Sequence, residues 1–306
     1  MRALLRVEVR RLLARRLVRV VAAAVVAGSV ATGIAVLATS REATPAQVRI
    51  AEAERQRAIE QCVIDGFNPP ATQADAADRR EFCVNEAIPA GQITFQLTDV
   101  LDILQGTDGK GSAAPLVIVS LLLGASFVGA EWRSRGLHAQ LGWEPRRPRV
   151  AATKVGVAAA AVFGGALLAQ AIVAVALVPA AILRGTTQGV DAGWMLSVGG
   201  AALRVALLSA IAGATGASLA MIGRSTAAAL GAVLVYGLVE LVVRGFEDPA
   251  WLRWLAGENG GLFVVADPAA SLRIGRSTIG ALIVLAAYAF AIFGVAIASF
   301  RARDVS

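Results

Sequence analysis

Long apolar runs separated by short polar segments dominate the chain. Six of these runs are long enough to cross a hydrocarbon core of about 30 Å, which takes roughly 20 apolar residues in a helix. Because lipid offers the backbone no hydrogen-bond partner, each run is predicted to be an α-helix. The predicted transmembrane helices cover residues 18–39, 113–130, 155–183, 194–222, 226–243 and 278–300. The fold class is therefore expected to be an all-α polytopic membrane protein.

A different pattern precedes the first apolar run. Over residues 1–17, arginines and apolar residues recur at helical spacing, which predicts an amphipathic helix lying in the membrane interface. One face of this helix carries Leu5, Val9 and Leu12, and another carries Arg2, Arg6 and Arg10.

Composition and charge agree with a membrane location and give an orientation. Hydrophobic residues make up 57% of the 306 residues and charged residues 17%, a balance that soluble proteins rarely show. With the N-terminus inside, 16 basic residues fall on the inner side and five on the outer side, leaving out the long segment 41–112. The sequence thus predicts a multi-pass protein of a bacterial cell membrane with both termini in the cytoplasm.

The long segment over residues 40–112 is predicted to be a helical insertion outside the cytoplasm. A helix is expected to begin at Thr44, with Pro45 in its first turn and Gln47 completing the cap. Further short helices are expected over 74–84 and 95–106. The segment also holds the only two cysteines, Cys62 and Cys83; a disulfide is favoured outside the cytoplasm, and two buried thiols are the alternative.

Two charged residues lie inside predicted spans. Arg204 and Glu240 stand 18 and 14 residues from the tight turn at 223–225, a depth difference of about 6 Å at ~1.5 Å per residue. We interpret them as an ion pair inside the bundle, because intramembrane charges are usually paired. Snorkelling to the interface or helix tilt would separate them instead. Residues 244–277, which mix Trp with Pro and Gly, predict a helical hairpin at the outer interface, although a tryptophan belt would look the same.

The segment over residues 131–154 connects the second and third spans and would lie in the cytoplasm. It combines charged residues with a glycine and two prolines, and a lipid anchor would need only the basic ones. The candidate coupling residues are Glu131, Arg133, Gly136, Leu141, Pro145, Arg146, Arg147, Arg149 and Lys154. Glu131 is expected to pair with a basic residue of a partner protein, and Lys154 to fix the depth of the third helix.

The order of these residues resembles the coupling segment of exporter-type (type-2 class) ABC transporter permeases. That family typically shows Glu at the end of the second helix, then Gly, an apolar run, Pro, Arg, and Lys at the start of the third helix. An interfacial N-terminal helix, six spans and a basic tail such as "FRARDVS" are also similar. Leu137 stands where the family usually has Thr.

The resemblance implies a permease subunit that is not itself an enzyme. ATP and Mg²⁺ would bind a separate cytoplasmic ABC ATPase, and this chain would bind no cofactor, no metal ion and no nucleic acid. A second permease copy, as a homodimer, and membrane lipid would be its other partners. The alternatives are a secondary transporter or channel that uses Arg204 and Glu240, and a membrane sensor that reads ligands through residues 41–112. The sequence does not identify the substrate.

Overall fold

The computed structural model describes most of the chain. The described residues are 2–40, 44–64, 80, 83, 95–106, 111–134, 136–142, 144–246, 249–266, 271 and 274–302. They divide into two compact units, which we treat separately. Unit 1 comprises Met1–Ser29, Leu101–Ala174 and Ala192–Ser306, and unit 2 comprises Val30–Val100 and Val175–Asp191.

Within the described ranges, six helices are long and apolar enough to cross a membrane, which confirms the predicted fold class. They are α2 (Arg16–Thr39), α6 (Ala113–Arg133), α8 (Arg147–Arg184), α9 (Ala192–Gly223), α10 (Thr226–Arg244) and α14 (Thr278–Ala302). None of the residues with an assigned position forms a strand. Helix α8 begins eight residues before the predicted span at 155, because the basic residues that precede the apolar run continue the same helix.

The centre of unit 1 is the contact between α6 and α9. A Cβ atom on Gly124 would collide with the carbonyl oxygen of Gly213, and one on Gly216 with that of Leu121. Only glycine therefore permits this backbone approach, as is common where membrane helices pack without large side chains. Two further small residues of α9 are also buried, Ala212 at 8% exposure and Ala220 at 0%.

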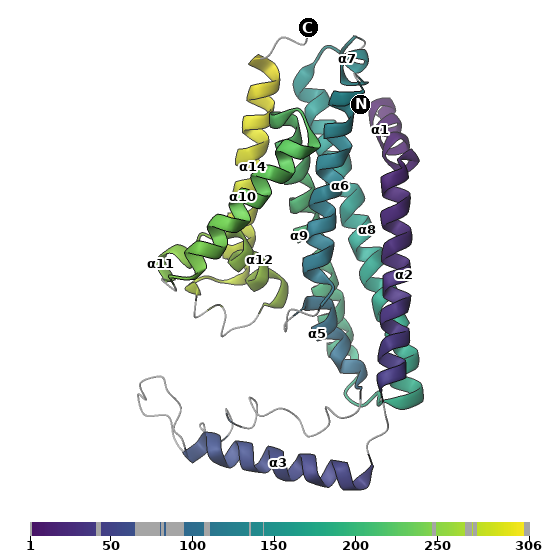
Figure 1. Ribbon diagram of the computed structural model, residues 1–306, viewed down its shortest axis with the longest axis vertical. Coiled ribbons are helices and arrows are strands. Elements are labelled where there is room, and N and C mark those ends of the chain that lie inside the picture. Colours follow the sequence, from purple (N-terminus) through teal and green to yellow (C-terminus); the bar gives the residue numbers. More distant parts are fainter. Residues whose placement is uncertain are drawn as a thin grey trace. The chain divides into compact units, whose positions relative to one another are not determined.

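One end of unit 1, which we call the basic end, gathers segments that are distant in sequence. Helices α1 (Arg2–Ala14) and α7 (Gly136–Leu141), the start of α8 and the end of α14 meet there (Figure 1). Leu12 of α1 is buried, whereas Leu5 and Val9 stay 40% and 44% exposed. The predicted apolar face of α1 is therefore divided between the protein and its surroundings.

The polypeptide after α10 forms short helices, as the predicted hairpin requires. These are α11 (Pro249–Leu252) and α12 (Ala256–Val265), and α12 packs against α9 and α14. The Tyr288 hydroxyl donates to the Trp254 carbonyl at 2.8 Å, and the Ala256 amide donates to the Tyr236 hydroxyl at 2.7 Å. Residues 247–248, 267–270 and 272–273 of the predicted hairpin lie outside the described part.

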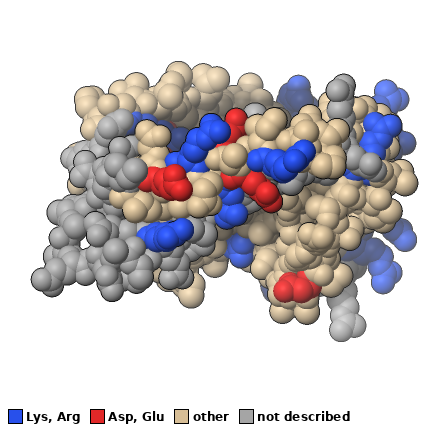
Figure 2. Space-filling model, turned by 90° about the horizontal axis from the view of Figure 1, so that it is seen from below, with Lys and Arg blue, Asp and Glu red and all other residues tan. Residues whose placement is uncertain are grey.

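In unit 2, α3 (Pro45–Ile64) begins as predicted. The Gln47 amide donates to Thr44 Oγ1 at 3.4 Å, and Gln47 Oε1 accepts from the Thr44 amide at 3.0 Å. The helix is largely exposed, and acidic and basic side chains are interspersed on the face shown in Figure 2.

The helix expected over 95–106 appears as η1 (Leu97–Asp99) and α5 (Val100–Gln105). Most of the helix expected over 74–84 falls outside the described residues, as do Trp143 and the last four residues.

Candidate functional site

A buried cluster of charged side chains lies at the basic end. Lys154 of α8 is 0% exposed, and its Nζ atom lies 3.0 Å from Glu8 Oε1 and 3.1 Å from Glu8 Oε2. The same ammonium group donates to Glu131 Oε2, at the end of α6. Glu8 and Glu131 are 0% and 6% exposed, so three helices place their charges in one water-poor contact. We call Glu8, Glu131 and Lys154 the charge cluster.

Two further side chains extend the charge cluster. Arg15, between α1 and α2, donates to the Ser126 carbonyl at 2.9 Å and lies 3.4 Å from Glu131 Oε1. Gln140 of α7 donates to Glu8 Oε1 at 2.8 Å. The cluster therefore connects α1, α6, α7 and α8 through polar contacts with side chains from each.

The surroundings of the cluster raise the strength of these contacts. Burial lowers the pKa of Arg15, while the nearby Glu131 and Glu8 carboxylates oppose that shift. The Phe127 ring lies under both cations, with its centroid 4.9 Å from Arg15 Cζ and 5.6 Å from Lys154 Nζ. In such a low-dielectric setting an ion pair is hard to break singly, because the remaining charge would be buried alone.

Two of the predicted coupling residues make contacts other than those expected. Glu131 was expected to pair with a partner protein, but its carboxylate is occupied by Lys154 and Arg15. Lys154 was expected to fix the depth of the third helix at the lipid surface, but it is buried inside the protein. The sequence analysis predicted only an interfacial helix over residues 1–17, whereas Glu8 of this helix also accepts from Lys154.

The remaining coupling residues range from half-buried to exposed. Gly136 begins α7, the side chain of the next residue, Leu137, is completely buried, and Leu141 packs partly against the apolar cluster that contains Leu137. Arg133, Pro145 and Arg146 are exposed. A shallow hollow beside them is lined by Pro145, Arg146, Arg147, Pro148, Arg149 and Arg301.

Some of these arginines are held in place by neighbours. Arg147 Nη1 lies 3.3 Å from the Arg301 carbonyl and 3.4 Å from that of Phe300, so it joins the start of α8 to the end of α14. Arg149 pairs with Glu144 at 3.4 Å. The four arginines around the hollow give this surface a strongly positive character.

The predicted ion pair between Arg204 and Glu240 is wrong, because each residue has another partner. Arg204 Nε donates to the Val264 carbonyl of α12 at 3.0 Å. Glu240 pairs with Arg244 one turn later in α10, at 2.8 Å, and Arg244 also contacts Glu258 at 3.2 Å. Matching the depths of two charges ignored the faces on which they lie and the closer groups supplied by α12. Arg204 and Glu240 therefore do not form the ion pair on which an ion-coupled transporter or channel was expected to depend.

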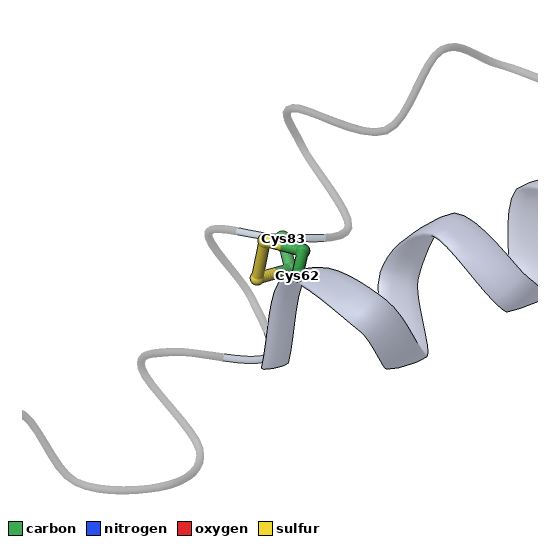
Figure 3. Close-up of a disulfide and its surroundings, with 2 residues drawn as sticks. All are labelled: Cys62 and Cys83. Atoms are coloured by element: carbon green, nitrogen blue, oxygen red, sulfur yellow. A yellow bond between two sulfur atoms is a disulfide. The ribbon is translucent and has the colours of Figure 1, made fainter. Parts of the chain in front are cut away.

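The predicted disulfide is present in unit 2. Cys62, in the last turn of α3, is bonded to Cys83, with 5.8 Å between their Cα atoms (Figure 3). The bond closes the chain after α3 and ties Cys83 to that helix.

Sequence reasoning missed Glu8 and Gln140. A signal for Glu8 was present, since it is the only acidic residue among seven arginines before residue 20, one turn before buried Leu12. Gln140 carried no comparable signal. No group of three or more His, Cys, Asp or Glu side chains in the described ranges could hold a metal ion. No family model, curated protein or solved structure matches this chain.

Proposed function

We propose that this chain is the membrane-spanning permease subunit of an ATP-driven exporter of the type-2 ABC class. A separate cytoplasmic ATPase would bind the basic end and hydrolyse ATP there. The permease itself would catalyse no reaction and would work with a second copy of the chain. The observation that carries the proposal is the way in which the charge cluster fastens α7 to three other helices.

A coupling element has to transmit force instead of bending. Helix α7 has only six residues and would be unstable in isolation. Within α7, the side chain of Leu137 is completely buried, and Gln140 donates a hydrogen bond to Glu8 of α1. Lys154, near the start of α8, pairs with both Glu8 of α1 and Glu131 at the end of α6. A force applied to α7 would therefore move α1, α6 and α8 together.

The surface next to α7 is suited to a partner protein of complementary charge. Arg133 and Arg146 are exposed. Pro145 limits the conformations of the chain between α7 and α8, and Pro148 lies in the first turn of α8. An acidic cleft on a soluble ATPase would match this surface. A lipid anchor would use the same arginines but would need neither the prolines nor a short helix fixed by buried polar groups.

The test uses surface residues, since Glu131→Arg would disrupt the charge cluster and not only a contact with a partner. The tagged chain is co-expressed with the ABC ATPase encoded next to it in the genome and purified in detergent. Wild type should retain the ATPase through size exclusion, and the Arg133→Glu/Arg146→Glu variant should release it. Arg253→Glu, an exposed arginine on the segment between α11 and α12, is the matched control and should retain it.

A second readout separates the proposal from the lipid-anchor alternative. In vesicles that lack anionic lipid, the complex of wild-type chain and ATPase should keep its ATP hydrolysis rate, because the contact is between proteins. Failure of the wild-type chain to bind the ATPase would contradict the proposal. So would an effect of the double variant that appears only when anionic lipid is present.

A further inference from the structure

An elongated apolar cavity lies beside the charge cluster within unit 1. It has a volume of about 170 Å³, and its walls come from α2, α6 and α8. Its lining runs along α6 from Leu116 to Phe127 and along α8 from Ala158 to Ile172. These stretches correspond to a rise of about 16 Å and about 21 Å at ~1.5 Å per residue.

The chemistry of the cavity determines what can fill it. Its lining is almost entirely aliphatic, and an engineered apolar cavity of about 150 Å³ stays dry and accepts hydrocarbon molecules. Water is therefore a poor occupant. The lining extends over about the ~15 Å depth of one leaflet, half of a ~30 Å hydrocarbon core, so a single extended acyl chain matches it in chemistry and length. The enclosed space of about 170 Å³ holds only part of that chain, and the rest would lie along the open side of the cavity, where Gly165 is exposed.

One end of the cavity carries positive charge. Arg15 lines it, and its guanidinium, which has five N–H donors, uses Nη1 on Ser126 and Nη2 on Glu131. Arg16 and Arg19 follow within the first turn of α2 and are exposed, although they do not line the cavity itself. Among the described residues at this end, Glu8 and Glu131 of the charge cluster are the carboxylates that form ion pairs, and Glu131 is the one that pairs with Arg15.

We infer that this cavity is a binding site for one acyl chain of an anionic phospholipid, whose phosphate lies at Arg15, Arg16 and Arg19. The apolar lining of the cavity would hold the acyl chain, and the arginines would hold the headgroup at the level of the charge cluster. The inference depends on the membrane location of the helices and not on the proposed exporter function. The bound lipid would fill the space between α2 and the α6–α8 pair.

Two adjacent glycines of α8 provide a matched pair of variants. Gly165 lines the cavity and Gly164 does not. Both are exposed, and a Cβ atom on either would meet no atom within 4 Å. Gly165→Leu should therefore fill the cavity and Gly164→Leu should leave it open, with the same change of composition and the same gain in helix propensity.

The experiment uses the full chain in vesicles of phosphatidylcholine containing a minor fraction of phosphatidylglycerol with a diazirine in one acyl chain. After illumination, peptide mass spectrometry measures adducts on the cavity-lining parts of α6 and α8. Adducts on the exposed apolar face of α10, at Leu234, Leu238 and Leu241, serve as the internal reference for ordinary lipid contact. Gly165→Leu should lower the ratio of cavity to reference adducts roughly tenfold, the effect of displacing about two methylene groups.

A second arm tests the headgroup and needs no variant. Moving the diazirine to phosphatidylcholine should lower the cavity-to-reference ratio in wild type about fivefold, because the choline cation cancels the net negative charge that an arginine attracts with about 1 kcal/mol. Equal ratios for the two probes would overturn the assignment of an anionic lipid. An unchanged ratio in Gly165→Leu, or an equal loss in Gly164→Leu, would overturn the assignment of the cavity as the site.

Discussion

Replacing Lys154 with methionine tests the charge cluster most directly. Methionine keeps an unbranched side chain of similar reach but removes the ammonium group shared by Glu8 and Glu131. Removing one partner of a buried ion pair typically costs about 3–5 kcal/mol. Glu131 keeps Arg15 at 3.4 Å, and Glu8 keeps Gln140 at 2.8 Å. These remaining contacts place the expected loss at the lower end, about 3 kcal/mol.

The measurement is the free energy of unfolding in mixed micelles of dodecyl maltoside with increasing dodecyl sulfate. Arg146→Met removes an exposed cation from the same region and should change stability by less than about 0.5 kcal/mol. Changing Glu8 to glutamine together with Lys154→Met should recover most of the loss, since Glu131 keeps its pair with Arg15 and no unpaired carboxylate then remains. A Lys154→Met variant as stable as Arg146→Met would refute the reasoning, because the ammonium group would not be needed by its buried partners.

Three further predictions concern other parts of the molecule. Alkylation of the denatured, unreduced chain should label neither Cys62 nor Cys83, and labelling of both would contradict the disulfide. Reduction should lower the free energy of unfolding by about 3 kcal/mol, as expected for a loop with a sequence separation of 21. Gly124→Leu should prevent α6 and α9 from packing and lower the yield of folded protein, whereas a yield equal to that of Gly164→Leu would contradict the close contact. In a double-mutant cycle, Arg204→Met and Glu240→Gln should add to within about 0.5 kcal/mol, and a larger coupling would mean that the two residues meet after all.

The spans were predictable because the membrane imposes a strong local rule. Each span needs a run of apolar residues whose length is fixed by the bilayer, so its position can be read along the chain. The cap at Thr44 was predictable for a similar reason, since its partner Gln47 is only three residues away. The disulfide followed from having two cysteines, both in a segment predicted to lie outside the cytoplasm, and no others.

The charge cluster could not be predicted in the same way, because its members come from three helices and their contact Gln140 from a fourth. Glu8 lies 146 residues from Lys154 and 132 residues from Gln140. Glu8 stands out as the only acidic residue near the N-terminus, but no neighbouring residue shows whether it faces the protein or the lipid headgroups. The failed Arg204 pairing has the same origin, since its true partner is a backbone carbonyl, and any residue type could supply one.

That carbonyl gives the arginine of α9 a role in ending another helix. Val264 lies in the last turn of α12, where the final four carbonyl groups have no partner within the helix. The chain then turns sharply at Ala266, whose φ is 58°, and its amide satisfies only Leu262. Arg204 supplies a donor to the Val264 carbonyl and a positive charge to the negative pole of the α12 dipole. An arginine within a membrane span can thus be accommodated without a carboxylate, and the short helix that it caps is fastened to α9 at the point where it ends.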